Sequence, residues 1–416
     1  MSDPGAAPGP RGPLGPWLAI VGIALLARLA FVAIMPRAIL WPDGLEYDAV
    51  ARSLREHGTY GLQTLRPPGY PTLIAGVYAL FGESLLALRV VEAVLGAGCV
   101  AILGWAGMAT FGSAAGLIGA TLMALHPVLA FLPSTQYSEN TLVLVVVAAL
   151  AALFSAWRGR GPWGWLVAGG LFGVAALVRP AAVFMLPGLG LGLVLALRAR
   201  ARSWILPMLV ALAALMATVA PWVVRGHRVH GQWFFIASGG GRQFWVGNNP
   251  RATAETTSPT QWNAAERESI HSYPEDIARE RWHYREGLRF VRAEPARAGW
   301  LYLKEISNLF ALWPETFSRT VSLGPWGRWA QGTASVMIFA GALMALARVR
   351  GEPLLWPLVG AVVSFTLVSA MFFTVMRYRM VIEPCLLWLA GLGWAGTGWG
   401  MAIARRLGFS GSRGGS

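Results

Sequence analysis

The sequence predicts an all-α protein that crosses a membrane repeatedly, with about ten transmembrane helices and a helical region on the outer face of the bundle. Of its 416 residues, 55% are hydrophobic and 13% are charged, whereas soluble domains carry roughly 25% charged residues. The mean hydropathy is +0.52. The hydrophobic residues also gather in long runs, which is typical of membrane-spanning segments.

The predicted transmembrane helices are the apolar runs that are long enough to cross a bilayer. The first has no small-residue cleavage site, so we expect a retained helix rather than a signal peptide. A further run, Gly69–Phe81, is too short to cross and predicts an interfacial or re-entrant helix. The spanning runs are Trp17–Met35, Leu85–Met108, Ser113–Leu132, Thr141–Trp157, Trp163–Val178, Ala181–Leu197, Trp204–Val224, Ala330–Ala347, Leu354–Phe373 and Met380–Ala404.

The arginines orient this bundle. The net charge is +14, and Lys304 is the only lysine. Because arginines of alternate short connections fall on one side, the positive-inside rule makes that side cytoplasmic and places both termini there. Nucleic acid is not an expected partner, since the arginines lie beside apolar runs and suit topology and anionic lipid contacts better. The orienting residues are Arg158, Arg160, Arg198, Arg200, Arg202, Arg348, Arg350, Arg405 and Arg406.

The topology divides the chain into five parts. They are a disordered cytoplasmic tail (1–16), an N-terminal transmembrane module (17–224) whose first outer loop spans 37–84, an outer loop region with amphipathic helices (225–328), C-terminal transmembrane helices (329–404) and a cytoplasmic tail (405–416).

Acidic residues gather in the first outer loop. Pro42 and Asp43 predict the start of a short helix. Asp43 and Glu46 are three residues apart and share one face of it, which fits either ordinary capping with a solvated face or a functional site. The stiff turn Arg66–Pro71 then returns the chain to the membrane.

A carboxylate near a transmembrane segment requires a partner. Glu139 lies within one turn of a predicted span. Its candidate partners are arginines at the outer ends of other spans, Arg179, Arg377 and Arg379. Such a cluster could be a structural ion-pair network or an anion site, because guanidinium groups match phosphate oxygens. The histidines are scattered without a ligand pattern, so no histidine metal site is expected.

These features, in this order, resemble the GT-C glycosyltransferases, specifically the bacterial branch related to protein O-mannosyltransferases and to the aminoarabinose transferases of lipid A. Many relatives have adjacent acids at the first motif, whereas here Gly44 follows Asp43 and the second acid is Glu46. The residues that carry the resemblance are Asp43 with Tyr47, Arg66–Pro71, Glu139, Arg179–Pro180, Gly247–Pro250, and Arg377–Arg379 with Pro384.

The resemblance implies a GT-C-like bundle that transfers a sugar from a polyprenyl-phosphate donor to an acceptor hydroxyl with inversion. Asp43 would be the general base, and Glu46 and Glu139 would orient the acceptor or the arginines. Arg179, Arg377 and Arg379 would bind the donor phosphate. Further substrate contacts are expected from Tyr47, Arg66, Tyr70, Tyr137, Asn248, Lys304 and Tyr378.

The same resemblance implies the expected partners and the expected cellular location. The partners are the lipid bilayer, the donor, and a glycan, lipid or protein acceptor. No cofactor is required; the acidic pairs could hold a divalent metal, but nothing implies one. The expected location is the bacterial cytoplasmic membrane, with the site on the periplasmic side.

Other classes of protein also fit a polytopic bundle. A lipid or small-molecule transporter, such as a flippase, would explain intramembrane charges, but no pair of interrupted helices in matching halves is found. A structural membrane subunit is disfavoured because acids and arginines cluster on one face. Among enzymes, a ligase that uses polyprenyl-pyrophosphate glycans is the nearest competitor.

Overall fold

The protein is described here from a computed structural model, which describes residues 14–159, 163–196, 201–254, 276–313, 324–347 and 351–398. Within these ranges every regular element is a helix, as predicted. The N-terminal half contains α1 (Leu14–Ile34), α2 (Pro42–His57), α3 (Gly69–Phe81), α4 (Leu85–Phe111), α5 (Ser113–Ala124), α6 (Pro127–Phe131), η1 (Leu132–Ser134), α7 (Glu139–Trp157), α8 (Trp163–Val178), η2 (Pro180–Met185) and α9 (Leu186–Ala196). The remainder contains α10 (Ala201–His230), α11 (Gly240–Gly247), α13 (Asp276–Ala293), α14 (Pro295–Leu309), α15 (Gly324–Leu346), α16 (Leu355–Ser369), η5 (Met376–Val381) and α17 (Glu383–Ala395).

A helix lies at each predicted transmembrane position, but fewer than ten are long enough by themselves. Among the described residues, five helices satisfy both length and hydropathy for a crossing: α1, α4, α7, the Trp204–His230 part of α10, and the Trp326–Leu346 part of α15. Helix α5 and the segment Pro127–Ser134 form a sixth candidate with a bend of 60°. The bend coincides with Pro127, which cannot continue the hydrogen-bond ladder of α5. The chain is therefore a multi-pass bundle, and the number ten stays a prediction.

Small residues let the apolar helices pack closely. At the contact between α9 and α16, a Cβ atom added to Gly188 would lie 1.9 Å from the carbonyl oxygen of Gly360. Only glycine permits this approach, which is the usual way in which membrane helices gain dispersion contacts. Helix α9 is consequently held against α16, and η2, which directly precedes α9, lies beside the same helix.

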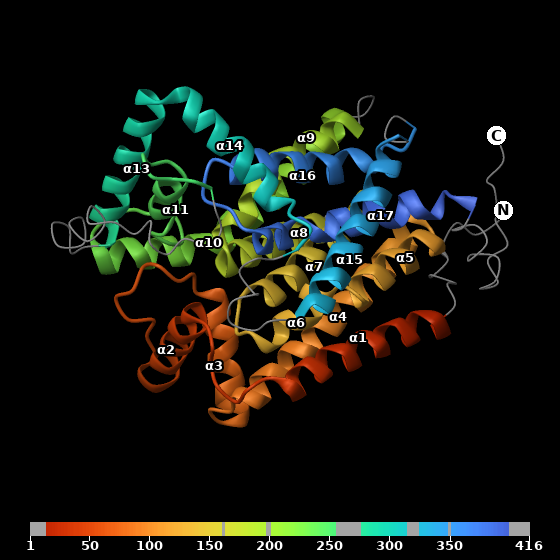
Figure 1. The fold of residues 1–416 in the computed structure, drawn as a ribbon, viewed down its shortest axis with the longest axis horizontal. Coiled ribbons are helices and arrows are strands. Elements are labelled where there is room, and N and C mark those ends of the chain that lie inside the picture. The colour runs from red at the N-terminus through yellow and green to blue at the C-terminus, as the bar shows by residue number, and fades with distance from the viewer. Residues whose placement is uncertain are drawn as a thin grey trace.

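The helices outside the apolar bundle gather at one end of it. Figure 1 shows α2 and α3 on one side of this end and α11 and α13 on the other. The two sides are joined where the Ser238 N–H donates to the carbonyl oxygen of Thr64, at 2.9 Å. The predicted outer regions, 37–84 and 225–328, thus meet in space, although Thr64 and Ser238 are 174 residues apart in the chain.

The arginines that oriented the bundle mostly lie outside the described residues. This applies to Arg160, Arg198, Arg200, Arg348, Arg350, Arg405 and Arg406, and to the side chain of Arg202. The sidedness of the protein and the position of its termini therefore stay predictions.

Candidate active site

A cavity of about 750 Å³ lies where the outer helices meet the bundle. Its lining comes from α2, the loop before α3, the start of α7, η2, α11, α13, α16 and η5. It is large enough for a drug-sized ligand, since such sites measure about 300–1,000 Å³. Nine of the predicted site residues line it: Asp43, Glu46, Tyr47, Arg66, Tyr137, Glu139, Arg179, Arg377 and Tyr378.

Asp43 lies between two arginines from distant parts of the chain. Pro42 starts α2, which places Asp43 in its first turn. Arg66 donates from Nη2 to Asp43 Oδ1 at 2.8 Å, and Arg377 donates from Nη2 to Oδ2 at 2.9 Å. Burial would raise the pKa of Asp43, but the guanidiniums of Arg377 and Arg66 outweigh it and hold the pKa well below its usual range. Asp43 is therefore ionised at neutral pH.

The structure explains why a glycine follows Asp43. A Cβ atom added to Gly44 would lie 2.8 Å from Ile39 Cγ2 and 3.2 Å from Gln136 Cβ. Gln136 cannot easily yield, because its backbone adopts a positive φ of 56° just before Tyr137. The second acid is instead Glu46, whose Oε2 accepts from Arg66 Nε at 2.7 Å. One arginine thus joins both acids of α2.

A second cluster surrounds Glu139, which is 1% exposed in the first turn of α7. Arg179 Nη1 donates to Glu139 Oε1. Arg377 Nε lies 3.6 Å from the same oxygen. The Arg377 guanidinium also stacks 4.2 Å from the centre of the Tyr137 ring, and that of Arg179 lies 4.4 Å from the Tyr378 ring. Stacking on rings leaves guanidinium edges available for an anion.

Arg377 retains unused donors. Its Nε and Nη1 are buried and have no hydrogen-bond partner among the described residues. An unpaired buried N–H of a charged group is costly, so a ligand with acceptor oxygens would stabilise this arrangement. Burial raises the pKa of the neighbouring Tyr137 to about 12. This effect is larger than the opposite effect of the Arg377 guanidinium, which lowers the pKa. Its phenol stays protonated at neutral pH and can donate a hydrogen bond.

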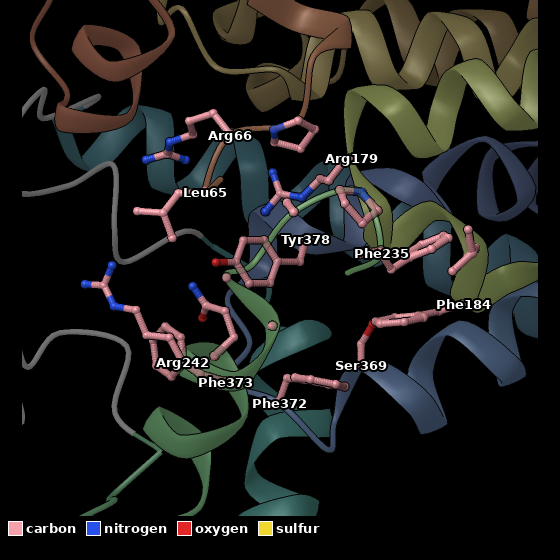
Figure 2. Close-up of a pocket in the computed structure, with 18 of the residues that line it drawn as sticks. Leu65, Arg66, Arg179, Phe184, Phe235, Arg242, Ser369, Phe372, Phe373 and Tyr378 are labelled. Atoms are coloured by element: carbon pink, nitrogen blue, oxygen red, sulfur yellow. The ribbon is translucent and has the colours of Figure 1, made fainter. Parts of the chain in front are cut away.

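The opposite side of the cavity is apolar and aromatic. Figure 2 shows Phe184, Phe235 and Phe372 on one side, with the guanidiniums of Arg66 and Arg179 on the other. Phe184 stacks on Phe372 with ring centres 5.7 Å apart. One side of the cavity is therefore charged and the other is aromatic, an arrangement that suits an amphipathic ligand.

The structure does not bring Arg379, which was expected to contact the donor phosphate, to this cavity. Its side chain is fully buried, and Nε donates to Glu383 Oε2 at 2.8 Å. Another nitrogen, Nη1, donates to the carbonyl oxygen of Ala311 at 3.1 Å. Because residues two apart point to different sides of the short η5 turn, only one of Arg377 and Arg379 can face the ligand. Arg379 holds helices together instead.

Three further predicted contacts also lie away from the cavity. Tyr70 is fully buried and packs edge-on beneath Tyr47 with ring centres 5.1 Å apart. Asn248 donates to the carbonyl oxygens of Phe244 and Met371. The ammonium group of Lys304 lies over the ring of Trp300 at 5.4 Å. All three support neighbouring structure rather than the cavity wall.

Sequence reasoning missed a third wall of the cavity. Arg242 and Gln243 of α11 and Tyr284 of α13 line it, as does the aromatic loop Trp233–Phe235. In Figure 2, Arg242 lies on the side of the view away from Phe184. The run of aromatic residues before a glycine-rich turn was a usable signal, because clustered exposed aromatics often mark binding sites.

The two carboxylates of α2 are both paired with arginines in this arrangement. Asp43 and Glu46 share Arg66, and the arginine nitrogens lie within 3 Å of both. A divalent cation would be repelled by these charges. Within the described ranges, no group of three or more potential ligands is close enough to hold a metal ion.

Comparison with known proteins agrees with this architecture. The family profile of the dolichyl-phosphate-mannose-protein mannosyltransferases matches residues 65–224. No curated protein sequence matches the chain. The oligosaccharyltransferase of Archaeoglobus fulgidus, in complex with Zn and sulfate, has a similar fold, with a TM-score of 0.53 and 13% identity. That match covers 94% of this chain and 50% of the oligosaccharyltransferase, so this chain spans about half its length.

Two structures of ArnT from Cupriavidus metallidurans were also found. The complex with undecaprenyl phosphate gives a TM-score of 0.46 at 14% identity, and the apo form gives 0.41 at 16%. Each match covers 91% of this chain and 77% of ArnT. The chain thus shares a family profile over residues 65–224 with these mannosyltransferases and a fold with the oligosaccharyltransferase.

Proposed function

We propose that the protein transfers a sugar from a polyprenyl-phosphate donor to an acceptor hydroxyl at the outer face of the bacterial cytoplasmic membrane, inverting the anomeric carbon. The observation that carries the proposal is Arg377, which lines the cavity beside Asp43 and whose Nη1 has no hydrogen-bond partner among the described residues. The matched family profile describes enzymes of a dolichyl-phosphate sugar, which is a donor of the same class.

The donor phosphate would bind between Arg377 and Arg179. Both guanidiniums line the cavity and share Glu139 as a counter-charge. As the bond from the anomeric carbon to the phosphate oxygen breaks, negative charge grows on the leaving polyprenyl phosphate. Preorganised arginines stabilise such charge most strongly where water is excluded. The aromatic wall around Phe184 and Phe372 suits the prenyl chain.

Asp43 would act as the general base on the acceptor hydroxyl. Its carboxylate accepts the proton while the hydroxyl oxygen bonds to the anomeric carbon from the side opposite the phosphate. Its pKa is low while both arginines bind it, which makes it a weak base. A phosphate that draws Arg377 away removes one of these charges, so the pKa of Asp43 would rise as the donor binds.

The test uses the purified full chain in nanodiscs with a labelled polyprenyl-phosphate hexose, a polyprenyl-phosphate pentose, and a set of glycan, lipid and peptide acceptors. We expect release of polyprenyl phosphate that depends on one donor and one acceptor class. Movement of intact labelled donor between leaflets, without its consumption, would support a flippase and contradict the proposal. Consumption of polyprenyl-pyrophosphate glycans alone would support the ligase.

A further inference from the structure

The segment that carries Arg377 is fixed by the outer helices. Before η5 the chain runs without regular structure from Met371 to Val375. Helix α11 holds its first part: the Phe373 N–H donates to the carbonyl oxygen of Gln243 at 3.0 Å, and Asn248 Nδ2 donates to that of Met371 at 2.8 Å. An irregular segment without such bonds would move on a fast timescale.

Glu305 of α14 holds the next residue, Thr374. Oε2 of Glu305 accepts from the Thr374 backbone N–H at 2.8 Å. The Thr374 hydroxyl lies 2.8 Å from the same oxygen and 2.7 Å from the carbonyl oxygen of Glu305. Asn308 Nδ2 also donates to Oε2, at 3.3 Å. One carboxylate oxygen therefore gathers three donors, two of them from Thr374.

Thr374 lies on the short segment that leads into η5 and Arg377. Val375 is extended, and the Tyr378 N–H donates to its carbonyl oxygen at 2.9 Å, which closes the first turn of η5. Arg377 lies inside that turn, three residues after Thr374. A change in the position of Thr374 therefore rotates the turn and displaces the guanidinium, whose contact with Asp43 is only 2.9 Å long.

We infer that Glu305 is a positioning residue that acts through Thr374 to hold the Arg377 guanidinium in the cavity. The catalytic task of Arg377 rests on the proposed function; the anchoring of its segment does not. Glu305 is 1% exposed, and its Oε1 has no hydrogen-bond partner among the described residues. Burying a carboxylate costs free energy because the group loses its hydration. An apolar side chain would fill the same space without that cost, so packing alone does not explain Glu305.

The experiment compares Glu305→Gln, Glu305→Ala and Thr374→Val in the full-length protein. Glu294→Gln is the matched control, because Glu294 immediately precedes the same helix and its side chain forms an ion pair with exposed Arg297. Hydrogen–deuterium exchange of residues 371–378 reports anchoring without any substrate. We expect Glu305→Ala and Thr374→Val to speed exchange there roughly tenfold, since the loss of one or two hydrogen bonds is enough for this factor. Glu305→Gln keeps one acceptor oxygen and should restore most of the protection.

Kinetics test the link to Arg377. Because the guanidinium contributes most in the transition state, we expect Glu305→Ala to lower kcat about tenfold or more while KM for the donor changes less than about threefold. In an Arg377→Lys background, Glu305→Ala should change kcat by less than about twofold, as expected for residues that act together.

The outcomes separate the two proposals. Unchanged exchange at 371–378 in both Glu305→Ala and Thr374→Val overturns the positioning role, whatever the reaction is. Faster exchange with kcat losses that multiply in the double variant also overturns it, because Glu305 would then act independently of Arg377. Faster exchange in the variants, combined with a wild-type protein that consumes no polyprenyl-phosphate sugar, leaves the anchoring established and rejects the proposed function.

Discussion

Asp43→Asn removes the charge that joins the two sides of the cavity while keeping the shape of the side chain. Asparagine offers one acceptor oxygen in place of two. One of the bonds from Arg66 and Arg377, at 2.8 and 2.9 Å, is therefore lost. A hydrogen bond to a charged group contributes about 1.5–3 kcal/mol. Since the Asp43 side chain is 27% exposed, water screens part of this term, and we expect a stability loss of about 1–2 kcal/mol.

The loss of activity should be much larger than the loss of stability. A positioned general base contributes about 10²–10⁴-fold to a rate, so kcat should fall by at least ~100-fold. The assay measures sugar transfer in nanodiscs at saturating donor, with thermal unfolding measured on the same samples. Asp48→Asn is the matched control: Asp48 lies in the same helix and also pairs with an arginine, Arg52, at 2.7 Å, but does not line the cavity.

Two results would refute the reasoning. If Asp43→Asn keeps kcat within about threefold of wild type, Asp43 is not the base. If Asp48→Asn loses as much activity as Asp43→Asn, the loss reflects a disturbed α2 rather than missing chemistry.

Three further outcomes are expected. Arg377→Lys keeps the charge but loses the planar donor fork, so kcat should fall about 10–10³-fold, whereas Arg289→Lys, at an exposed side chain, should leave the rate unchanged. Gly44→Ala places a Cβ against Ile39 and Gln136 and should destabilise the protein by about 1–3 kcal/mol, seen as a lower Tm; an unchanged Tm would show that the loop yields freely. The low pKa of Asp43 stabilises the fold fully above its unfolded pKa of about 3.9, and this stabilisation is lost as pH falls below that value. The stability difference between wild type and Asp43→Asn should thus be constant from pH 5 to 8 and shrink below about pH 4; a change near pH 6 would contradict the ionised state.

The sequence determined the class of protein and the helices that compose it. Runs such as Leu85–Met108 are expected to be buried in lipid or among other helices, because they are long and strongly hydrophobic. Local signals were equally direct for α2, which starts at Pro42, and for α3, which spans Gly69–Phe81 as expected. Each of these predictions depends on residues that are close to one another in the chain.

The tertiary structure decided which charges meet. Arg377 and Arg379 are two residues apart and looked equivalent in sequence, yet one lines the cavity and the other is sealed between helices against Glu383. The difference arises from the rotation of the η5 turn, which Glu305 of α14 fixes through its hydrogen bonds to Thr374. No local pattern encodes that rotation.

Membrane insertion follows from composition, since hydrophobicity is a property of the residues themselves. The active site depends on geometry. The pairing of Asp43 with Arg377 joins residues 334 positions apart, and the aromatic wall around Phe184 forms only when η2 packs beside α16. The sequence by itself therefore determined that the chain lies in the membrane and which acids and arginines were available. Only the packed helices decided that Asp43, Glu139, Arg179 and Arg377 share one cavity, because distances between remote residues are set by packing and not by order along the chain.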